Sequence, residues 1–433
     1  MNPPRQNDVN GTEQHGRSRN VMVNLSIFQF LTFLRRGVFY TFMINYLFTL
    51  MGTITSTAAL GTMNMIASAL GQNLLWGRIC DRCKSRARLI IAGETIAAFA
   101  YIAVFFAHTS LISMGDNFGA GLSIIFGLSI LEFFWSMSDV GWAALLTDIT
   151  TPKIRGTVVG TLNFIASLGR TFGITFAGFL YNEGEGFRNG TIFYTVAVLL
   201  LIGAALMTWT SRYVGTKAPR NKEEDPDGPE PQGSTGDEKT FKWLLASLVV
   251  IILGAASASQ VFLRFLEIPK GLEASGPEMS LVLTAWTLGG MAASLTMGRF
   301  SDKIGRSKAM LVGLGLATAT PLFYGFALKV PIMAVVYGLN GVAFWTMQTV
   351  GFVLAGDLIP QHKRGRLMGR YNTVMALSWG PAGFLIGGPF ADMQTRLLGL
   401  PENVAYVNAF YLSSSILLVG VVLFALKVAR QRK

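Results

Sequence analysis

The sequence contains little charge for its length. Only 14% of its 433 residues are charged, against about a quarter in a soluble globular domain, and 51% are hydrophobic, with a mean hydropathy of +0.45. No charged residue occurs between Gly37 and Gly77, a run long enough for two bilayer crossings of about 20 residues each. This scarcity of charge excludes an ordinary soluble enzyme and predicts an integral membrane protein.

Cysteine and histidine are also scarce. Cys80 and Cys83 are the two cysteines, so the sequence has no disulfide framework of the kind found in small secreted domains. Their spacing suits a metal ion, but no second cysteine pair or nearby histidine completes a tetrahedral ligand set. None of the three histidines lies in the middle of an apolar run, and no nucleophile motif occurs. We therefore expect no enzymatic activity, no metal and no cofactor.

Apolar runs of spanning length, bounded by charge clusters or by Gly and Pro turns, divide the chain into membrane spans. They predict twelve transmembrane helices, at about 23–50, 56–77, 88–108, 122–147, 156–181, 191–211, 243–266, 279–298, 308–328, 332–356, 366–390 and 405–426. The first 20 residues lack the apolar core of a cleaved signal peptide. We therefore expect the first span to act as its own signal.

Positive charge is distributed unevenly along the chain. The net charge of +12 would suggest a nucleic-acid partner in a soluble protein. Here most of the 36 Lys and Arg residues fall in the tails and the even-numbered connections, and the positive-inside rule then places both termini in the cytoplasm. This sorting explains the charge, so we expect a monomer in the lipid bilayer of the plasma membrane and no nucleic-acid partner.

A hydrophilic segment rich in Pro, Gly and carboxylates separates two halves of six spans. The predicted organisation is an N-terminal tail (1–22), an N-terminal bundle (23–211), a cytoplasmic linker (212–242), a C-terminal bundle (243–426) and a C-terminal tail (427–433). The halves repeat, because TDITTPKIRGTVVGTLN after the fourth span matches GDLIPQHKRGRLMGRYN after the tenth. A parallel duplication of this kind is typical of secondary transporters, which rock one half against the other.

A second motif pair strengthens the repeat. The connection after the second span reads GRICDRCKSR, and the one after the eighth reads GRFSDKIGRS. With these motifs the chain, from about Val21 to Lys427, resembles a member of the major facilitator superfamily. The resemblance implies an all-α membrane protein with twelve transmembrane helices in two six-helix pseudo-repeated bundles. In the first copy Lys84 stands where the family has a glycine.

In the family this loop latches the two halves on the cytoplasmic side when the site faces outward. The resemblance implies Asp81 as the latch residue, with the start of the span near Arg366 as its partner. The implied cytoplasmic gate residues are Gly77, Asp81, Arg82, Arg86, Asp148, Arg155, Gly298, Asp302, Lys303, Arg306, Asp357 and Arg364. The alternative is that the cations of these loops only determine topology at the headgroups.

Five ionisable residues lie well inside predicted spans, where a charge costs several kcal/mol unless it is paired or hydrated. They are Arg35, Arg36, Glu132, Asp139 and Arg170. Their depths suggest two pairs, Asp139 with the first-span arginines and Glu132 with Arg170. Helical phase places Arg36, Tyr40 and Arg170 on polar faces toward a central cavity and Arg35 in an ion pair within its half. Alternatively, all five form a structural network.

Glu132 and Asp139 are the candidate proton carriers. Glu132 is our first choice, because its neighbours Phe133, Phe134 and Trp135 disfavour a buried charge. The C-terminal half offers aromatic and amide side chains that can contact an organic solute. The candidates for the central cavity there are Asn340, Trp345, Gln348 and Trp379, and Trp286 and Asn372 are further side chains of this kind in the C-terminal half.

The sequence thus predicts a secondary active transporter that moves a small organic solute by alternating access and is coupled to protons. Three alternatives stay open: a uniporter, an organic-anion exchanger of the same fold, and a substrate sensor that transports nothing. The residues determine neither the substrate nor its charge, because acids and arginines are balanced inside the predicted spans.

Overall fold

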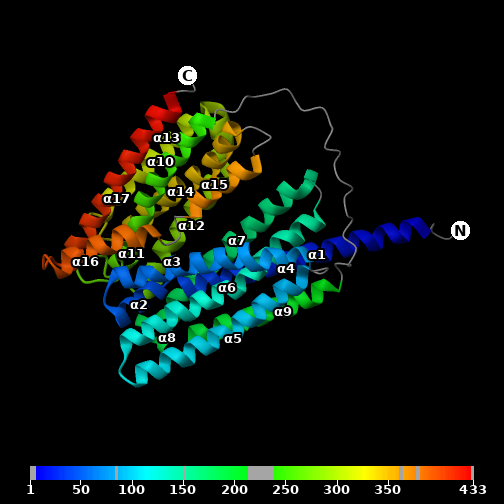
Figure 1. The fold of residues 1–433 in the computed structure, drawn as a ribbon, viewed down its shortest axis with the longest axis horizontal. Coiled ribbons are helices and arrows are strands. Elements are labelled where there is room, and N and C mark those ends of the chain that lie inside the picture. Colours follow the sequence, from blue (N-terminus) through cyan, green and yellow to red (C-terminus); the bar gives the residue numbers. More distant parts are fainter. Residues whose placement is uncertain are drawn as a thin grey trace.

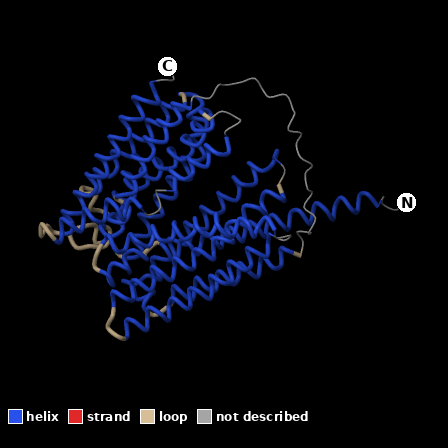
Figure 2. The backbone as a smooth tube through the Cα atoms, viewed as in Figure 1, coloured by secondary structure: helices blue, strands red, loops and turns tan. Residues whose placement is uncertain are grey.

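The structure, a computed structural model, describes residues 6–82, 86–150, 152–212, 238–359, 364–376 and 381–430. This part of the chain consists of helices and short connections and contains no strand (Figure 2). The helices group into twelve membrane-crossing segments arranged in two bundles (Figure 1). The predicted linker lies largely outside the described residues.

The N-terminal bundle contains the first six crossing segments. Its helices are α1 (Gln6–Tyr40), α2 (Met43–Met51), α3 (Ile54–Leu70), η1 (Gly71–Trp76), α4 (Gly77–Arg82), α5 (Arg86–Ser113), α6 (Asn117–Ile149), α7 (Pro152–Tyr181), η2 (Asn182–Gly184), α8 (Glu185–Arg188) and α9 (Thr191–Ser211). Local signals start and stop them. Thr53 accepts a hydrogen bond from the Ser56 amide at the start of α3, and Asp116 accepts one from the Gly119 amide at the start of α6. Gly52 ends α2 in the left-handed conformation.

The C-terminal bundle repeats this order. Its helices are α10 (Glu238–Ser257), α11 (Ser259–Phe265), α12 (Gly276–Ile304), α13 (Arg306–Tyr324), α14 (Val330–Leu358), α15 (Arg364–Ala376), η5 (Gly383–Gly387), α16 (Gly388–Arg396), α17 (Glu402–Phe424) and η6 (Ala425–Ala429). A capping box between Ser275 and Glu278 starts α12. The π-helical segment η1 lies in the second crossing of the N-terminal half, and η5 lies in the fifth crossing of the C-terminal half.

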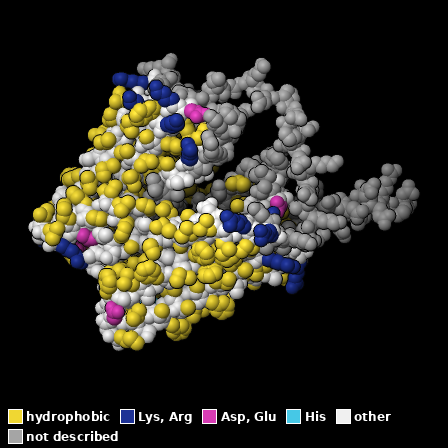
Figure 3. All heavy atoms as spheres, viewed as in Figure 1, with side chains coloured by type: hydrophobic (Ala, Val, Ile, Leu, Met, Phe, Trp, Pro, Cys, Tyr) yellow, Lys and Arg dark blue, Asp and Glu magenta, His cyan; other side chains and the backbone are white. Residues whose placement is uncertain are grey.

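The flanks of both bundles are apolar. Among the described residues, eight helical segments are long and apolar enough to cross a bilayer by length and composition alone. Large hydrophobic side chains such as Phe179 and Leu295 are about 70% exposed on these flanks, where lipid covers them in a membrane. Figure 3 shows hydrophobic side chains over both bundles, whereas most Lys and Arg side chains lie toward the end that carries the two termini.

Helices α1 and α7 cross in close contact through glycines. A Cβ atom added at Gly173 would lie 2.2 Å from the Leu34 carbonyl oxygen, and one added at Gly169 would lie 2.3 Å from that of Phe30. Small residues allow two backbones to approach closely in lipid, where packing rather than the hydrophobic effect holds helices together. This contact fixes the rotation of α1 against α7 and therefore the directions of Arg36 and Arg170.

Gly173→Ala is expected to destabilise the protein by about 1–3 kcal/mol, because overpacking forces the two backbones apart. Gly160→Ala on the same helix is the matched control, since nothing lies within 4 Å of a Cβ atom added there. The control should be neutral or stabilising by up to about 1 kcal/mol through helix propensity. The melting temperature of each purified variant tests this. Equal shifts in the two variants would mean that the crossing is not tight.

The two bundles meet at one end of the molecule and diverge toward the other (Figure 1). At the closed end, α2, α11 and α16 lie together, and α7 packs along α12. Gly178 and Gly276 allow the close approach of α7 and α12, and Ser280 donates to the Ile174 carbonyl at 2.8 Å. Both termini and α15 lie at the open end. The structure therefore has one sealed end and one open end.

Candidate functional site: the cleft between the bundles

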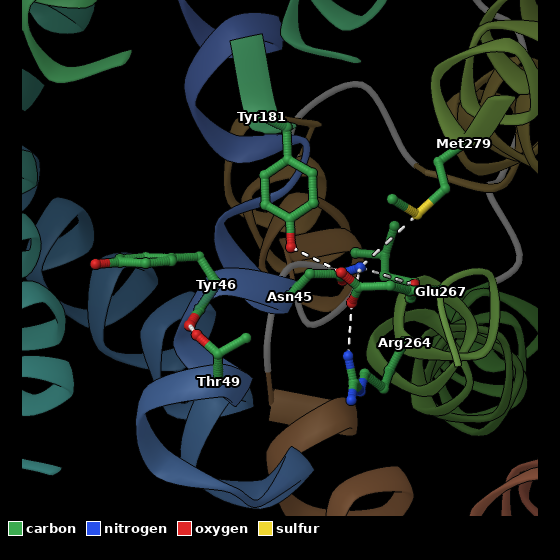
Figure 4. A network of polar contacts seen from close by, with 8 residues as sticks. Asn45, Tyr46, Thr49, Tyr181, Arg264, Glu267 and Met279 are labelled. Atoms are coloured by element: carbon green, nitrogen blue, oxygen red, sulfur yellow. Dashed lines mark hydrogen bonds and ion pairs between the residues drawn. The ribbon is translucent and has the colours of Figure 1, made fainter. Parts of the chain in front are cut away.

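Glu267 joins the two bundles at the sealed end. It accepts hydrogen bonds from Asn45 of α2 at 3.0 Å and from Tyr181 of α7 at 3.0 Å, both in the opposite half (Figure 4). Within its own half it pairs with Arg264 at 2.6 Å, and the Arg264 guanidinium lies over the Phe48 ring. One carboxylate thus links three side chains from both bundles.

Two charges of α16 hold the turn between α2 and α3. Asp392 accepts hydrogen bonds from the amides of Ile54 and Thr55 at 3.0 and 2.8 Å, and Arg396 donates to the Gly52 carbonyl at 2.6 Å. The acid therefore lies at the positive N-terminus of α3 and the arginine at the negative C-terminus of α2, which is the favourable arrangement for both helix dipoles. These contacts close the cleft at this end.

Arg36 and Asp139 lie together on the wall that the N-terminal bundle presents to the cleft. Their charged atoms are 3.7 Å apart, and their side chains are 29% and 42% exposed. The Arg36 guanidinium also lies 4.3 Å from the centre of the Trp135 ring. Glu132, two turns earlier on α6, is half-buried and forms no ion pair within the described part of the chain. Tyr40 is half-buried at the end of α1 and packs edge-on against Phe39.

Arg35 forms no ion pair with a described residue, whereas the sequence predicts one within its half. The residue is 2% exposed, and its guanidinium donates to the Tyr101 hydroxyl at 3.2 Å and lies 4.8 Å from the centre of the Trp135 ring. The acid on this side, Glu94, instead accepts hydrogen bonds from Trp135 and Ser138, both at 2.8 Å. The indole of Trp135 therefore contacts both the buried arginine and the buried acid.

Glu94 is a buried acid that is not among the predicted site residues. It lies near the start of the predicted span at 88–108, yet it is only 2% exposed. Helix α5 begins at Arg86, so Glu94 lies more than two turns inside it. The adjacent Gly93 is the signal that was available, because a Cβ atom there would lie 2.9 Å from the Ser138 side chain. That close approach of α5 and α6 seals Glu94 from solvent.

Arg170 and Glu132, which were predicted to pair, form no ion pair between their described side chains. Arg170 instead extends across the cleft, where its guanidinium lies 5.8 Å from the centre of the Trp286 ring of α12. Trp286 donates to Asn340 at 3.2 Å, and Asn340 donates to Thr320 at 2.9 Å. Asn340 thus orients the tryptophan that faces Arg170.

A pocket of about 350 Å³ lies between α14 and α15 in the C-terminal bundle. Its lining residues are Trp345, Gln348, Thr349, Phe352, Val353, Tyr371, Asn372 and Met375. The Trp345 indole nitrogen and the Tyr371 hydroxyl are buried, and neither has a hydrogen-bond partner within the described chain. Trp345 and Gln348 were predicted for this role, whereas Trp379 lies outside the described residues. The Trp345 nitrogen packs against Gly290 of α12, so the Tyr371 hydroxyl is the unpaired donor that belongs to the pocket.

The gate residues implied by the motifs form ion pairs within each half. Arg86 lies 3.3 Å from Asp148, and the equivalent Arg306 pairs with Asp357 and lies 4.0 Å from Asp302. Gly77 begins α4, and Arg82 and Lys303 are exposed. The side-chain positions of Asp81, Arg155, Gly298 and Arg364 lie outside what the structure describes. The described pairs join helix ends of one bundle, as expected at the open end.

Among the described residues, no group of three or more His, Cys, Asp and Glu side chains is arranged to hold a metal ion. Cys83 lies outside the described residues, so the structure does not describe the Cys-x-x-Cys pair. The N-terminal bundle contributes two arginines and two acids, Arg36, Arg170, Glu132 and Asp139, and the C-terminal bundle contributes aromatic and amide side chains.

Two similar helical bundles in a membrane, with polar side chains in a cleft between them, define a polytopic membrane transporter. The comparison with known sequences agrees with the motifs. The chain belongs to the Major Facilitator Superfamily, whose family model matches residues 25–267 and 245–433. It is therefore a membrane transporter of small molecules and not an enzyme.

Individual relatives are distant. Multidrug resistance protein 1 of Bacillus subtilis is 25% identical over 257 residues, which cover 51% of this chain and 62% of that protein. A probable 4-methylmuconolactone transporter of Cupriavidus pinatubonensis is 29% identical over 34% of this chain and 31% of its own length. The match to an uncharacterized MFS-type transporter of Mycobacterium tuberculosis, MT1926, spans 22% of that protein at 24% identity.

Solved structures share the fold over nearly the whole chain. A bacterial homologue of the iron transporter ferroportin, in an inward-facing state, superimposes with a TM-score of 0.68 at 17% identity and covers 95% of this chain and 99% of that one. The peptide transporter POT in complex with sulfate gives a TM-score of 0.66 at 12% identity and covers 95% of both chains. At these identities the likeness establishes the fold alone.

Proposed function

We propose that the protein is a secondary active transporter that moves a small organic solute by alternating access, with Glu132 as the proton carrier. The observation that carries the proposal is the contrast between the two acids of α6. Asp139 has Arg36 at 3.7 Å, whereas Glu132 has no ion-pair partner among the described residues. A half-buried acid without a fixed counter-ion can gain and lose a proton as its surroundings change.

The groups around Glu132 support this role. The charged side chains whose fields act on it are Arg35, Arg36 and Asp139, and the phenols of Tyr40 and Tyr101 lie within the same field. Arg36 is shared with Asp139, and Arg35 is held by Tyr101 and Trp135. A proton on Glu132 therefore breaks no existing ion pair. Uniport and exchange use the same cleft but need no protonation of Glu132.

We also propose the orientation and organisation that the sequence predicts, with a monomer in the plasma membrane, both termini in the cytoplasm and a cytoplasmic linker at 212–242. The Lys and Arg side chains that gather toward the end with the termini support this orientation. The open end of the cleft then faces the cytoplasm. In the outward-facing state, the motif loops that contain Asp81, Asp148, Asp302 and Asp357 would close the cytoplasmic end.

Glu132→Gln imitates the permanently protonated acid and tests the coupling. In proteoliposomes with an imposed pH gradient, it should lower uphill accumulation at least about 100-fold while solute exchange continues, because the proton-dependent step is lost and binding is not. A suitable solute panel is 4-methylmuconolactone, benzoate, benzyl alcohol and benzylamine. Glu185→Gln, an exposed loop acid paired with Arg188, is the control and should transport normally.

Asp139→Asn separates the two acids. It leaves Arg36 without its partner, so it should lower the melting temperature, an effect that Glu132→Gln should not have. If Glu132→Gln protein still accumulates a solute when driven by a pH difference, the assignment of the proton carrier is wrong. Uniport, or coupling through Asp139, would then be the better account.

A further inference from the structure

Arg170 is a cation in the cleft without an acidic partner. Its described surroundings are the Trp286 ring at 5.8 Å, Tyr337 and the positive field of Arg36, and no carboxylate of the described chain pairs with it. The N-terminal wall therefore contains one satisfied pair, Arg36 with Asp139, and one unsatisfied cation. An unpaired buried cation is costly unless a mobile anion neutralises it.

Helices α12 and α14 on the opposite wall carry their described charges only at their ends. The described charged side chains of α12 and α14 are Glu278, Asp302, Lys303 and Asp357, and all lie in the first or last turn of their helix. The middle of these helices presents aromatic rings instead. Trp286 lies 6.4 Å from Trp345, centre to centre, and Trp345 lines the pocket between α14 and α15. A continuous aromatic surface thus leads from Arg170 to that pocket.

The far end of this surface offers unused hydrogen-bond donors. Tyr371 is 2% exposed, and its hydroxyl lies against Gly351, where an added Cβ atom would be 3.1 Å away. Neither this hydroxyl nor the Trp345 indole nitrogen has a partner in the described chain. The amides of Gln348 and Asn372 line the same pocket. The Trp345 nitrogen packs against Gly290 of α12, whereas an acceptor oxygen on a ligand in the pocket would satisfy the Tyr371 hydroxyl.

We propose that the cleft takes a small monoanionic organic acid with a planar, ring-sized apolar body and a second oxygen, carried together with a proton. The carboxylate pairs with Arg170, the ring lies along Trp286 and Trp345, and the second oxygen enters the pocket of Tyr371. The substrate class rests on the proposed transport function.

Charge balance explains why anion and proton travel together. In the empty cleft, the negative charge of an ionised Glu132 offsets the positive charge of Arg170, which belongs to the same bundle. When an anion binds Arg170, protonation of Glu132 restores the same net charge. The loaded and empty clefts then carry equal charge through the low-dielectric interior, which avoids the cost of moving a net charge during the conformational change.

The test uses the purified full-length protein and four probes that differ in charge or in one hydroxyl. They are 4-hydroxybenzoate, benzoate, 4-hydroxybenzyl alcohol and tyramine. Both acids should raise the melting temperature in a concentration-dependent way, with 4-hydroxybenzoate acting at lower concentration, and the alcohol and the amine should not. Arg170→Gln should weaken binding of both acids by about 10- to 100-fold, the value of a hydrogen-bonded charge.

Tyr371→Phe distinguishes a specific site from a general positive field. It should remove the preference for 4-hydroxybenzoate over benzoate while leaving benzoate binding intact. Arg188→Gln, which changes an exposed loop arginine, should leave all binding unchanged. If the amine or the alcohol stabilises the protein and the acids do not, the substrate class is wrong. Acid binding that survives Arg170→Gln unchanged also overturns it.

Flux measurements separate this inference from the proposed function. Proton-driven accumulation of tyramine or the alcohol in proteoliposomes, without uptake of acids, would support transport and overturn the substrate class. Binding of the acids that depends on Arg170, without flux under any gradient, would support the site and overturn transport. Proton-coupled uptake of 4-hydroxybenzoate that is lost in Arg170→Gln supports both.

Discussion

Glu94→Leu is expected to destabilise the protein by about 3–5 kcal/mol, because it removes the acid beside a buried arginine. The change deprives Trp135 and Ser138 of their acceptor and removes the acid that acts most strongly on Arg35, which is 2% exposed. Thermal unfolding of the purified protein and its recovery as a monodisperse peak measure the effect. Glu94→Gln should cost less, since its amide oxygen still accepts a hydrogen bond.

The double variant Arg35→Leu with Glu94→Leu tests whether the two residues act as one unit. It should be more stable than the sum of the two single changes predicts, because a lone buried charge is worse than none. Glu185→Leu removes an exposed acid and should change stability by less than about 0.5 kcal/mol. Strict additivity of Arg35 and Glu94 would contradict the coupling through Trp135.

Glu267→Ala is expected to open the sealed end of the cleft. It removes the acceptor of Asn45 and Tyr181, two bonds between the bundles that exist only while this end is closed. Hydrogen bonds to a charged group contribute about 1.5–3 kcal/mol each. The ratio of molecules open at this end to molecules closed at this end should therefore rise at least tenfold. The change should alter the populations of the two states far more than it alters solute binding.

Spin labels at Met114→Cys and Leu398→Cys can follow this opening, with Cys80 and Cys83 replaced by serine. Both label sites are exposed, at 75% and 63%, and belong to different bundles near the sealed end. Glu267→Ala should shift their distance distribution toward longer values. Glu402→Ala changes an exposed acid at the start of α17 and should not. An unchanged distribution in Glu267→Ala would show that Asp392 and Arg396 hold this end closed by themselves.

Much of the fold could be predicted from the sequence, because lipid imposes simple rules on a chain. Each crossing needs an apolar run of fixed length. The motif at Asp148 recurs at Asp357, which indicates the duplication directly. The proximity of Arg36 and Asp139 also followed from their depth and helical phase, since both lie at similar depth on polar faces of their helices. Depth by itself misplaced the other charges, because it does not give the rotation of one helix against another.

The sequence by itself determined the membrane class, the twelve spans, the two-fold repeat and the set of residues that carry charge into the bilayer. Only the tertiary structure decided which of those charges meet. The glycine crossing of α1 with α7 turns Arg170 toward Trp286 rather than Glu132, and the close approach of α5 and α6 buries Glu94 against Trp135. Asn45 and Glu267, 222 positions apart, meet only where the bundles touch. Hydrophobic periodicity records which face of a helix avoids lipid, whereas the partner on that face depends on how closely two backbones can approach.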